Sequence, residues 1–201
     1  MNDNFDLVVF EGVYPPSEDS YLLLDSVRFR SDDIVLDVGC GAGLMTLAAA
    51  TRVKRVLSID ISLEAVKNTK ENLKQNNLGH NVSLIQSNLL SPFSQNTKFS
   101  LIFFNPPYLP EDEDSTDIDH AFVGGVRGIE LTERFISEAT QHLIKGGRIY
   151  VVVSSLSDID GVISTLEEND FDIFHEKETS MFFEKIQVLR GVWQGHKETV
   201  L

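Results

Sequence analysis

The sequence predicts an α/β fold, a doubly wound and mostly parallel sheet of seven strands with an antiparallel last strand. Short β-branched runs alternate with longer amphipathic runs along the chain. This alternation is typical of folds that place helices on both faces of a parallel sheet. The last two strand-like runs have a connection too short for a crossover helix, so we expect them to pair antiparallel.

The elements follow from composition and periodicity, in chain order. The expected strands are IVLDV (34–38), RVLSID (55–60), VSLIQ (82–86), FSLIFF (99–104), RIYVVVS (148–154), FDIFHE (171–176) and FFEKIQVLRGVW (182–193). The expected helices are SYLLLDSV (20–27), LMTLAAATR (44–52) and residues 62–77, 131–144 and 157–170. Ser62 has the side chain and the position of a helix N-cap. The glycines of KGG (145–147) are expected to end the fourth helix.

Bulk properties limit the classes of function. The 201 residues suffice for one full core, and we expect a single domain over residues 1–201. The net charge of −14 does not favour a nucleic-acid partner. One cysteine, Cys40, excludes an intrachain disulfide and a cysteine-rich zinc site, and we expect no metal. The chain has neither a signal peptide nor an apolar run of about 20 residues, so we expect a cytoplasmic protein without membrane contact.

A glycine cluster, DVGCGAG (37–43), separates the first strand from its helix. In open α/β sheets, ligands bind at the carboxyl ends of the strands. The spacing G-x-G-x-G differs from G-x-G-x-x-G and weighs against a dinucleotide site. A tight turn without a ligand remains an alternative. However, Asp60, Asn88 and Asn105 end the next three strands, so four polar strand ends converge on one crevice.

With these features the chain resembles the class I S-adenosylmethionine-dependent methyltransferases, which have a Rossmann-like fold. The resemblance implies S-adenosylmethionine as the cofactor. It also implies that the glycine loop passes under the methionine part of the cofactor and that Asp60 holds the ribose hydroxyls. Asn88 then contacts the adenine, at a position where the family often has Asp.

The stretch NPPYLP (105–110) ends the fourth strand, because proline donates no ladder hydrogen bond. It resembles the [N/D]-P-P-[Y/F/W] motif of methyltransferases that modify adenine N6, cytosine N4 or a glutamine amide. The Asn105 side-chain oxygen can accept one N–H of such a group and the Pro106 carbonyl the other. Pro107 stiffens the turn, and Tyr108 can pack on the planar acceptor. A merely rigid turn is the alternative.

The stretch VYPPSEDSYLLLD (13–25) resembles the N-terminal segment of the HemK/PrmC-type glutamine methyltransferases. The resemblance implies that residues 1–30 cover the cofactor, with Ser20 and its acidic neighbours Glu18 and Asp19 near the methionine end. A helix-capping pattern is compatible with the same residues. The cofactor-binding residues expected in all are Ser20, Asp37, Gly39, Gly41, Gly43, Asp60, Ile61, Asn88, Leu89 and Asn105.

Only about a dozen residues precede this segment, so we expect no further N-terminal helical domain. In this respect the chain resembles the short archaeal and eukaryotic branch of the family. That branch implies N5-methylation of the glutamine in the GGQ loop of a class I translation release factor. It also implies a heterodimer with a small zinc-binding activator protein. LVVF (7–10) is a candidate surface for the activator, and an ordinary edge strand is the alternative.

Other functions remain open at this point. Adenine-N6 methylation of DNA or RNA shares NPPY, but the acidic charge opposes it. A protein lysine methyltransferase is a further alternative, and a non-catalytic cofactor-binding subunit is disfavoured by the intact NPPY turn. The acidic segment 111–128 is predicted to be a mobile loop. It either engages a basic protein surface or is simply solvated.

Overall fold

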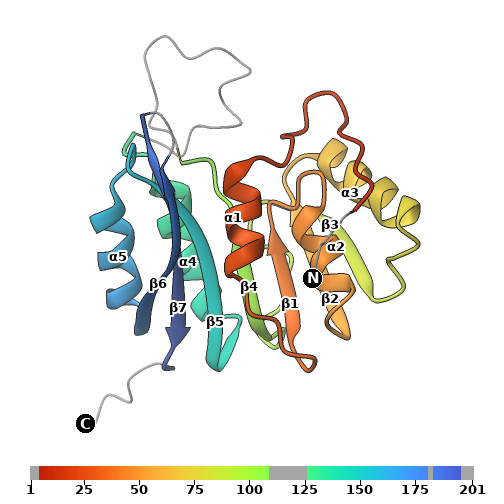
Figure 1. The fold of residues 1–201 in the computed structure, drawn as a ribbon. Coiled ribbons are helices and arrows are strands. Elements are labelled where there is room, and N and C mark those ends of the chain that lie inside the picture. Colours follow the sequence, from red (N-terminus) through yellow and green to blue (C-terminus); the bar gives the residue numbers. More distant parts are fainter. Residues whose placement is uncertain (1–4, 109–125, 181–182, 196–201) are drawn as a thin grey trace.

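The computed structural model describes residues 5–108, 126–180 and 183–195. Its strands form one seven-stranded sheet in the order β3-β2-β1-β4-β5-β7-β6 (Figure 1). β7 runs antiparallel to β5 and β6, and the other neighbours are parallel, so the predicted fold class is confirmed. The strands are β1 (Ile34–Val38), β2 (Arg55–Asp60), β3 (Val82–Gln86), β4 (Phe99–Phe104), β5 (Leu143–Ser154), β6 (Phe171–Ser180) and β7 (Lys185–Trp193).

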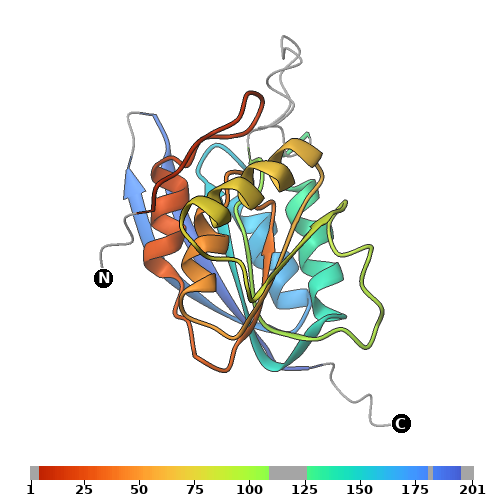
Figure 2. The same cartoon turned by 90° about the vertical axis from the view of Figure 1, so that its right-hand side faces the viewer.

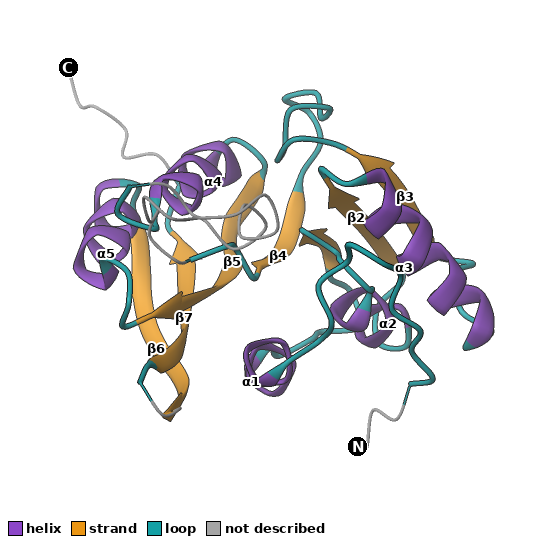
Figure 3. Cartoon of the chain, turned by 90° about the horizontal axis from the view of Figure 1, so that it is seen from above, coloured by secondary structure: helices purple, strands orange, loops and turns teal. Residues whose placement is uncertain are grey.

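Five helices cover the two faces of the sheet in the described part of the chain. They are α1 (Glu18–Ser26), α2 (Leu44–Ala50), α3 (Leu63–Gln75), α4 (Glu130–Thr140) and α5 (Ile159–Glu168). Figure 3 shows α1, α2 and α3 on one side of the sheet and α4 and α5 on the other. β1 is buried on both faces, because Val35 belongs to the core under α1 and α2 while Leu36 belongs to the core under α4.

The first four strands have the predicted bounds, and Ser62 caps α3 by accepting the Ala65 N–H at 3.3 Å. The prediction around KGG is wrong. α4 ends at Thr140, and β5 already begins at Leu143. The Phe99 N–H donates to the His142 carbonyl at 2.7 Å, which draws this stretch into the sheet. Gly146, with φ +76°, lies where the β4–β5 register shifts, so the glycines form an irregularity within a strand.

The stretch LVVF (7–10) is not a strand, so the edge-strand alternative is wrong. The edges of the sheet are β3 and β6. Residues 5–10 instead run along α3, and the two views of the red N-terminal segment beside yellow α3 agree on this (Figures 1 and 2). Residues 111–125 of the predicted acidic loop lie outside the described residues, and its mobility stays a prediction.

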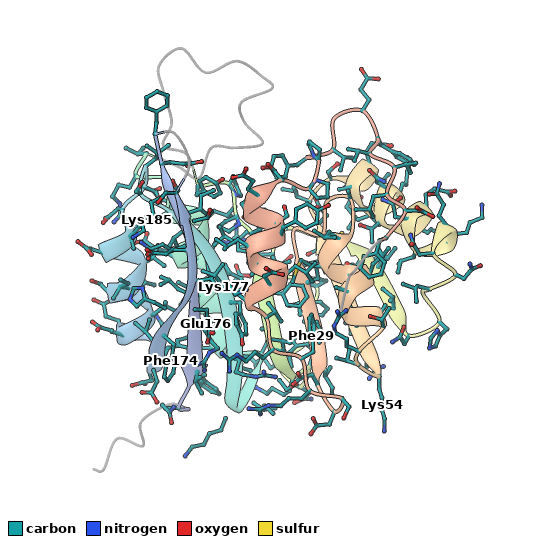
Figure 4. All side chains as sticks on the ribbon, in the orientation of Figure 1. Phe29, Lys54, Phe174, Glu176, Lys177 and Lys185 are labelled. Atoms are coloured by element: carbon teal, nitrogen blue, oxygen red, sulfur yellow. The ribbon has the colours of Figure 1, made fainter. Side chains whose placement is uncertain are left out.

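α1 lies across the β5, β7 and β6 part of the sheet, where it is tied by charged contacts. The Lys177 ammonium on β6 lies 3.3 Å from the Asp25 carboxylate of α1 (Figure 4). Glu176, also on β6, pairs with Arg190 of β7 and with Arg28 just after α1. The first turn of α1 lies at the carboxyl ends of the parallel strands, where Asp19 and Ser20 line the cavity described below. Among the described helices, none is long and apolar enough to cross a membrane.

Candidate active site

A cavity of about 690 Å³ opens at the carboxyl ends of β1, β2, β3 and β4. This is the volume of a small-molecule or cofactor site. All the residues expected to bind the cofactor or the acceptor line it. They are Ser20, Asp37, Gly39, Gly41, Gly43, Asp60, Ile61, Asn88, Leu89, Asn105, Pro106, Pro107 and Tyr108. The fold therefore brings the separate motifs of the sequence to one place, while their individual roles remain predictions.

The glycine loop comes close to both neighbouring elements. At Gly39, with φ +68°, an added Cβ would lie 3.3 Å from the Phe104 ring. At Gly43, with φ +92°, an added Cβ would lie 3.0 Å from the Thr69 side chain. Side chains here would strain the backbone and fill the space above it. The loop is thus a cradle of exposed backbone against the cavity.

Asp60 ties the glycine loop to the start of α3. One carboxylate oxygen accepts the Gly41 N–H at 2.9 Å, and the other accepts the Ser62 N–H at 2.8 Å. Burial raises the pKa of Asp60, and these backbone donors oppose that shift. Each oxygen can accept a further hydrogen bond, so the carboxylate remains able to bind a diol.

The rim after β3 is held by a local turn. The Ser87 hydroxyl donates to the Leu89 carbonyl at 2.8 Å, and Leu89 has the unusual φ of +49°. Leu89 is buried, whereas Ile61 across the rim is 68% exposed and Asn88 is also exposed. Two apolar side chains and an amide therefore line this end of the cavity, and the adenine contact expected for Asn88 stays a prediction.

Asp37 forms part of the cavity floor and is almost fully buried. The Thr46 hydroxyl donates to its carboxylate at 2.5 Å. Burial raises the pKa of Asp37 to about 7, and the Thr46 hydrogen bond opposes the shift. The nearby Cys40 thiol has its pKa raised by burial and by the charges of Asp37 and Asp60, so it stays a packing residue and not a nucleophile.

Asp19, in the first turn of α1, lines the cavity beside Asn105 and Tyr108. Its Oδ2 accepts from Asn105 Nδ2 at 3.0 Å, from the Tyr14 hydroxyl at 3.2 Å and from the Tyr108 hydroxyl at 3.5 Å. Its Oδ1 accepts from the Ser20 hydroxyl at 3.0 Å. Burial, followed by the charge of Asp19, raises the pKa of Tyr14 to about 12 and that of Tyr108 further. Both phenols are therefore donors at neutral pH.

The contact with Asp19 fixes which way the Asn105 amide faces. A carboxylate accepts hydrogen bonds only, so the NH2 group of Asn105 must face Asp19 and its carbonyl oxygen must face away. That oxygen, Oδ1, is buried and has no hydrogen-bond partner among the described residues. An unpaired buried acceptor costs about 1–3 kcal/mol. The end of β4 therefore carries an oriented hydrogen-bond acceptor that is unpaired among the described residues.

Three cavity residues were missed or given too small a role by sequence reasoning. The sequence-based interpretation names Asp19 only as a neighbour of Ser20, although both residues lie in SEDS at the start of the same helix. Tyr14 stands in VYPP, where an aromatic residue beside prolines could have been noticed. Glu184 is held by the Ser154 hydroxyl at 2.8 Å. The β6–β7 hairpin places Glu184 at the cavity, and no local sequence pattern predicts this position.

Comparison with known proteins identifies this arrangement. The model of the methyltransferase small domain family matches residues 16–177. This chain is a methyltransferase of that family. The methyltransferase is 38% identical over 183 residues to a Methanocaldococcus jannaschii protein provisionally assigned as a protein N5-glutamine methyltransferase, covering 89% of this chain and 91% of the relative. It is 30% identical to methyltransferase HEMK2 of Mus musculus, covering 79% of each chain.

A solved structure agrees with these relatives. The methyltransferase superposes with a TM-score of 0.72 and 25% identity on the E. cuniculi Mtq2–Trm112 complex, which is described as responsible for methylation of the eRF1 translation termination factor. The match covers 90% of this chain and 99% of that one. The resemblance to the HemK-type methyltransferases that the motifs suggested is confirmed. Among the described residues no cluster of metal-ligating side chains is found.

Proposed function

We propose that this methyltransferase uses S-adenosylmethionine to methylate the side-chain nitrogen of the GGQ glutamine of a class I translation release factor. The observation that carries the proposal is the buried Oδ1 of Asn105, which has no partner among the described residues and lies in a turn whose next carbonyl belongs to a proline. A glutamine amide has two N–H groups on one nitrogen, and two acceptors side by side match it. The glutamine methyltransferases among the relatives support this acceptor.

The protein's part in the reaction is to hold the amide nitrogen. An amide nitrogen is a weak nucleophile, because its lone pair is delocalised into the carbonyl group. Accepting both N–H groups at Asn105 and Pro106 fixes the plane of the amide and stabilises positive charge that develops on nitrogen during transfer. Tyr108 covers the plane from one side. The two reacting groups are thus held at close range, which accounts for much of the expected acceleration.

The cavity fits S-adenosylmethionine in chemistry as well as in size. When bound, the cofactor supplies an electrophilic methyl group on a positively charged sulfur. Asp60 has the oxygens to bind the ribose hydroxyls, and the open backbone of the glycine loop accommodates the methionine part. Asp37 and Ser20 lie at that end of the cavity. The carboxylates of Asp37, Asp60 and Asp19 give the site the negative charge that a sulfonium requires.

We further propose a heterodimer with a small zinc-binding activator protein, supported by the E. cuniculi complex. The sequence pointed to LVVF (7–10) for this contact, but backbone groups of Val8 and Phe10 are already bound by α3 side chains. The edge strand β3 is the better surface. A groove beside it is lined by apolar side chains of α3, of β3 and of the loop between them, namely Leu63, Val66, Leu73, Leu78, Val82 and Leu84.

The remaining parts of the proposal concern organisation. We propose one domain over residues 1–201, with residues 1–30 as the segment that covers the cofactor, because Gly12 to Ser20 contribute to the cavity. We also propose a cytoplasmic location, because translation termination takes place in the cytoplasm. The acidic segment 111–128 remains predicted to be a mobile loop. Its negative charge suits a basic protein surface better than a phosphate backbone.

The test is methyl transfer from labelled S-adenosylmethionine, with and without the activator protein. The acceptors are a release factor, its GGQ glutamine-to-asparagine variant and an adenine-containing oligonucleotide. We expect label on the wild-type release factor only. Label on the asparagine variant as well would move the target to another residue, such as a lysine. Label on the oligonucleotide alone would refute the glutamine assignment.

A further inference from the structure

Three asparagines of α3 hold the N-terminal segment by its backbone. Asn76 accepts the Asp6 N–H at 3.1 Å and donates to the Asp6 carbonyl at 2.9 Å. Asn72 accepts the Val8 N–H at 2.9 Å and donates to the Val8 carbonyl at 2.8 Å. We call Asn68, Asn72 and Asn76 the asparagine ladder and residues 6–16 the strap.

The third member continues the pattern. Asn68 accepts the Phe10 N–H and donates to the Val8 carbonyl, both at 2.8 Å. Four residues of a helix rise about 6 Å, and two residues of an extended chain span about 6.6 Å. Side chains four apart on α3 therefore match every second residue of the strap, and the two run in opposite directions. Val9, which lies between two of these residues, makes no such bond among the described residues.

The far end of the strap closes over the cavity. Gly12, Val13, Tyr14 and Pro16 all line the cavity wall. Val13 is buried and packs with Ala42 of the glycine loop and Ala65 of α3, next to the partly buried Phe10. The strap residues held by the ladder are thus continuous with those that cover the cofactor end of the site.

One amide joins the strap directly to the glycine loop. The NH2 group of Asn72 donates to the Ala42 carbonyl at 2.8 Å as well as to Val8. The next turn of α3 adds Thr69, whose hydroxyl donates to the Gly41 carbonyl at 2.9 Å. A displacement of the strap therefore disturbs the same side chain that supports the loop beneath the cofactor.

Asparagines on a buried helix face are unfavourable for helix stability. Asn68 and Asn72 have no exposed surface, and asparagine is a poor helix former compared with leucine or alanine. The strap gains little from side-chain burial between its ladder contacts, because Val8 and Val9 are 38% and 42% exposed. Phe5 and Leu7 add partly buried contacts near Leu73. Over residues 6–10 the six amide contacts therefore supply the backbone restraint, beside the partly buried Leu7 and Phe10.

We propose that the asparagine ladder positions the strap over the cavity and so sets how tightly and how long the cofactor is held. Asn68, Asn72 and Asn76 are then positioning residues that act through Val13 and the glycine loop. This inference rests on the proposed function only for the identity of the ligand, S-adenosylmethionine. It makes no demand on the methyl acceptor.

Two adjacent valines offer a matched test. Val8→Pro removes the N–H that Asn72 accepts, whereas Val9→Pro removes an N–H that has no hydrogen bond among the described residues. Both side chains are exposed, so neither change opens the core. The affinity and dissociation rate of S-adenosylmethionine are measured on the full chain by calorimetry and stopped-flow. We expect Val8→Pro to raise the Kd roughly five- to tenfold, mainly through faster dissociation, and Val9→Pro to change it less than about twofold.

A second pair of variants separates an effect on cofactor binding from a general loss of stability. Asn76→Ala removes the most exposed rung of the ladder. Asn81→Ala removes an amide that donates to the Ala50 and Val53 carbonyls and to no backbone group of the strap. Both variants lose amide-to-backbone bonds and are expected to unfold at lower temperature. Only Asn76→Ala is expected to speed cofactor dissociation.

Equal effects within both pairs would overturn the proposal, because the ladder would then act on stability alone. In that case a wild-type enzyme that still methylates the release factor would leave the proposed function intact. Conversely, selective loss of cofactor affinity in Val8→Pro and Asn76→Ala supports the ladder even if the release factor is not the acceptor. Failure of the wild-type chain to bind S-adenosylmethionine would refute both.

Discussion

The cofactor side and the acceptor side of the cavity are built in different ways. The proposed cofactor side consists of residues 37–43, 60–62 and 87–89, each at the carboxyl end of its own parallel strand. The acceptor side joins Asp19 from α1, Asn105 from the end of β4 and Glu184 from the turn before β7. Asp19 and Asn105 are 86 residues apart. The position of the first side therefore follows from local sequence patterns, whereas the second side forms only when distant parts of the chain have folded together.

The two sides also differ in how their polar groups are satisfied. Asp60 and Asp37 each accept hydrogen bonds from neighbouring residues, so the cofactor side is internally paired. On the acceptor side, Asp19 is bonded to an amide, a serine hydroxyl and two phenols, yet Asn105 Oδ1 has no hydrogen-bond partner among the described residues. In the part of the chain that the structure describes, the first side is thus internally paired, whereas the second has one buried acceptor left unpaired.

The largest expected effect follows from that acceptor. Asn105→Ala should lower kcat by a factor of about 1000, the upper range for loss of one group that stabilises transition-state charge. The cofactor Kd should stay within about threefold, because Asp60 and the glycine loop are untouched. Single-turnover methyl transfer and calorimetry on the same preparation measure both quantities. A parallel loss of cofactor binding would show that the two sides are not separable.

The opposite pattern is expected at Asp60. Asp60→Asn keeps the size of the side chain but removes its charge and replaces one acceptor with an NH2 group, which faces either the Gly41 or the Ser62 N–H. The KM for S-adenosylmethionine should rise by roughly 50-fold, while kcat at saturating cofactor changes little. Steady-state kinetics with the acceptor at saturation measures this. A fall in kcat without a change in KM would contradict the assignment of Asp60 to the cofactor side.

Asp19 tests the link between Asn105 and the rest of the acceptor side. With Asp19→Asn either group of the new amide can face Asn105, so the orientation of Asn105 is no longer determined. We expect kcat to fall about 10- to 50-fold, less than for Asn105→Ala, because the correct orientation remains accessible. The control is Glu18→Gln at the exposed neighbour, which should leave kcat unchanged. Equal effects in the two variants would indicate a general influence of negative charge at this helix start.

Much of the fold was predictable because its signals are local. The runs 34–38, 55–60, 82–86 and 99–104 are strands with the predicted bounds, since buried parallel strands are short and rich in β-branched residues. The stretch around KGG was misassigned. Its glycines resemble a helix end, but the bond from Phe99 to His142 already draws the chain into the sheet. A contact between residues so far apart in sequence leaves no periodic pattern.

The residues of the site likewise divide into those that local patterns predict and those that only the complete fold brings together. Asp60, Asn88 and Asn105 could be found because the end of a parallel strand has a known place in the fold. The asparagine ladder could have been suspected from Asn68, Asn72 and Asn76 at a spacing of four on one helix face. Their partner, however, is an extended segment about 60 residues earlier, and nothing local in the sequence announces that pairing. Glu184 is likewise placed only by the β6–β7 hairpin.

The smallest expected effect is a pH dependence of the cofactor side. Burial raises the pKa of Asp37 to about 7, from an ordinary value of 3.8, and also raises the pKa of Asp60. Because the folded state holds the Asp37 proton more tightly than the unfolded state, stability should fall as pH rises from about 4 to 7 and then level off. A cationic cofactor favours the ionised carboxylate, so its affinity should instead rise over the same upper range.

We therefore expect the Kd for S-adenosylmethionine to fall roughly three- to tenfold between pH 6 and pH 8, with protons released on binding. Calorimetry in buffers of different ionisation enthalpy measures both. Asp37→Asn should flatten the profile and should make the ligand-free protein more stable than wild type at pH 8 but not at pH 4. An unchanged profile in that variant would assign the titration to another group, with Asp60 the nearest candidate. The acceptor side should show no such dependence, since Tyr14 and Tyr108 keep their protons throughout this range.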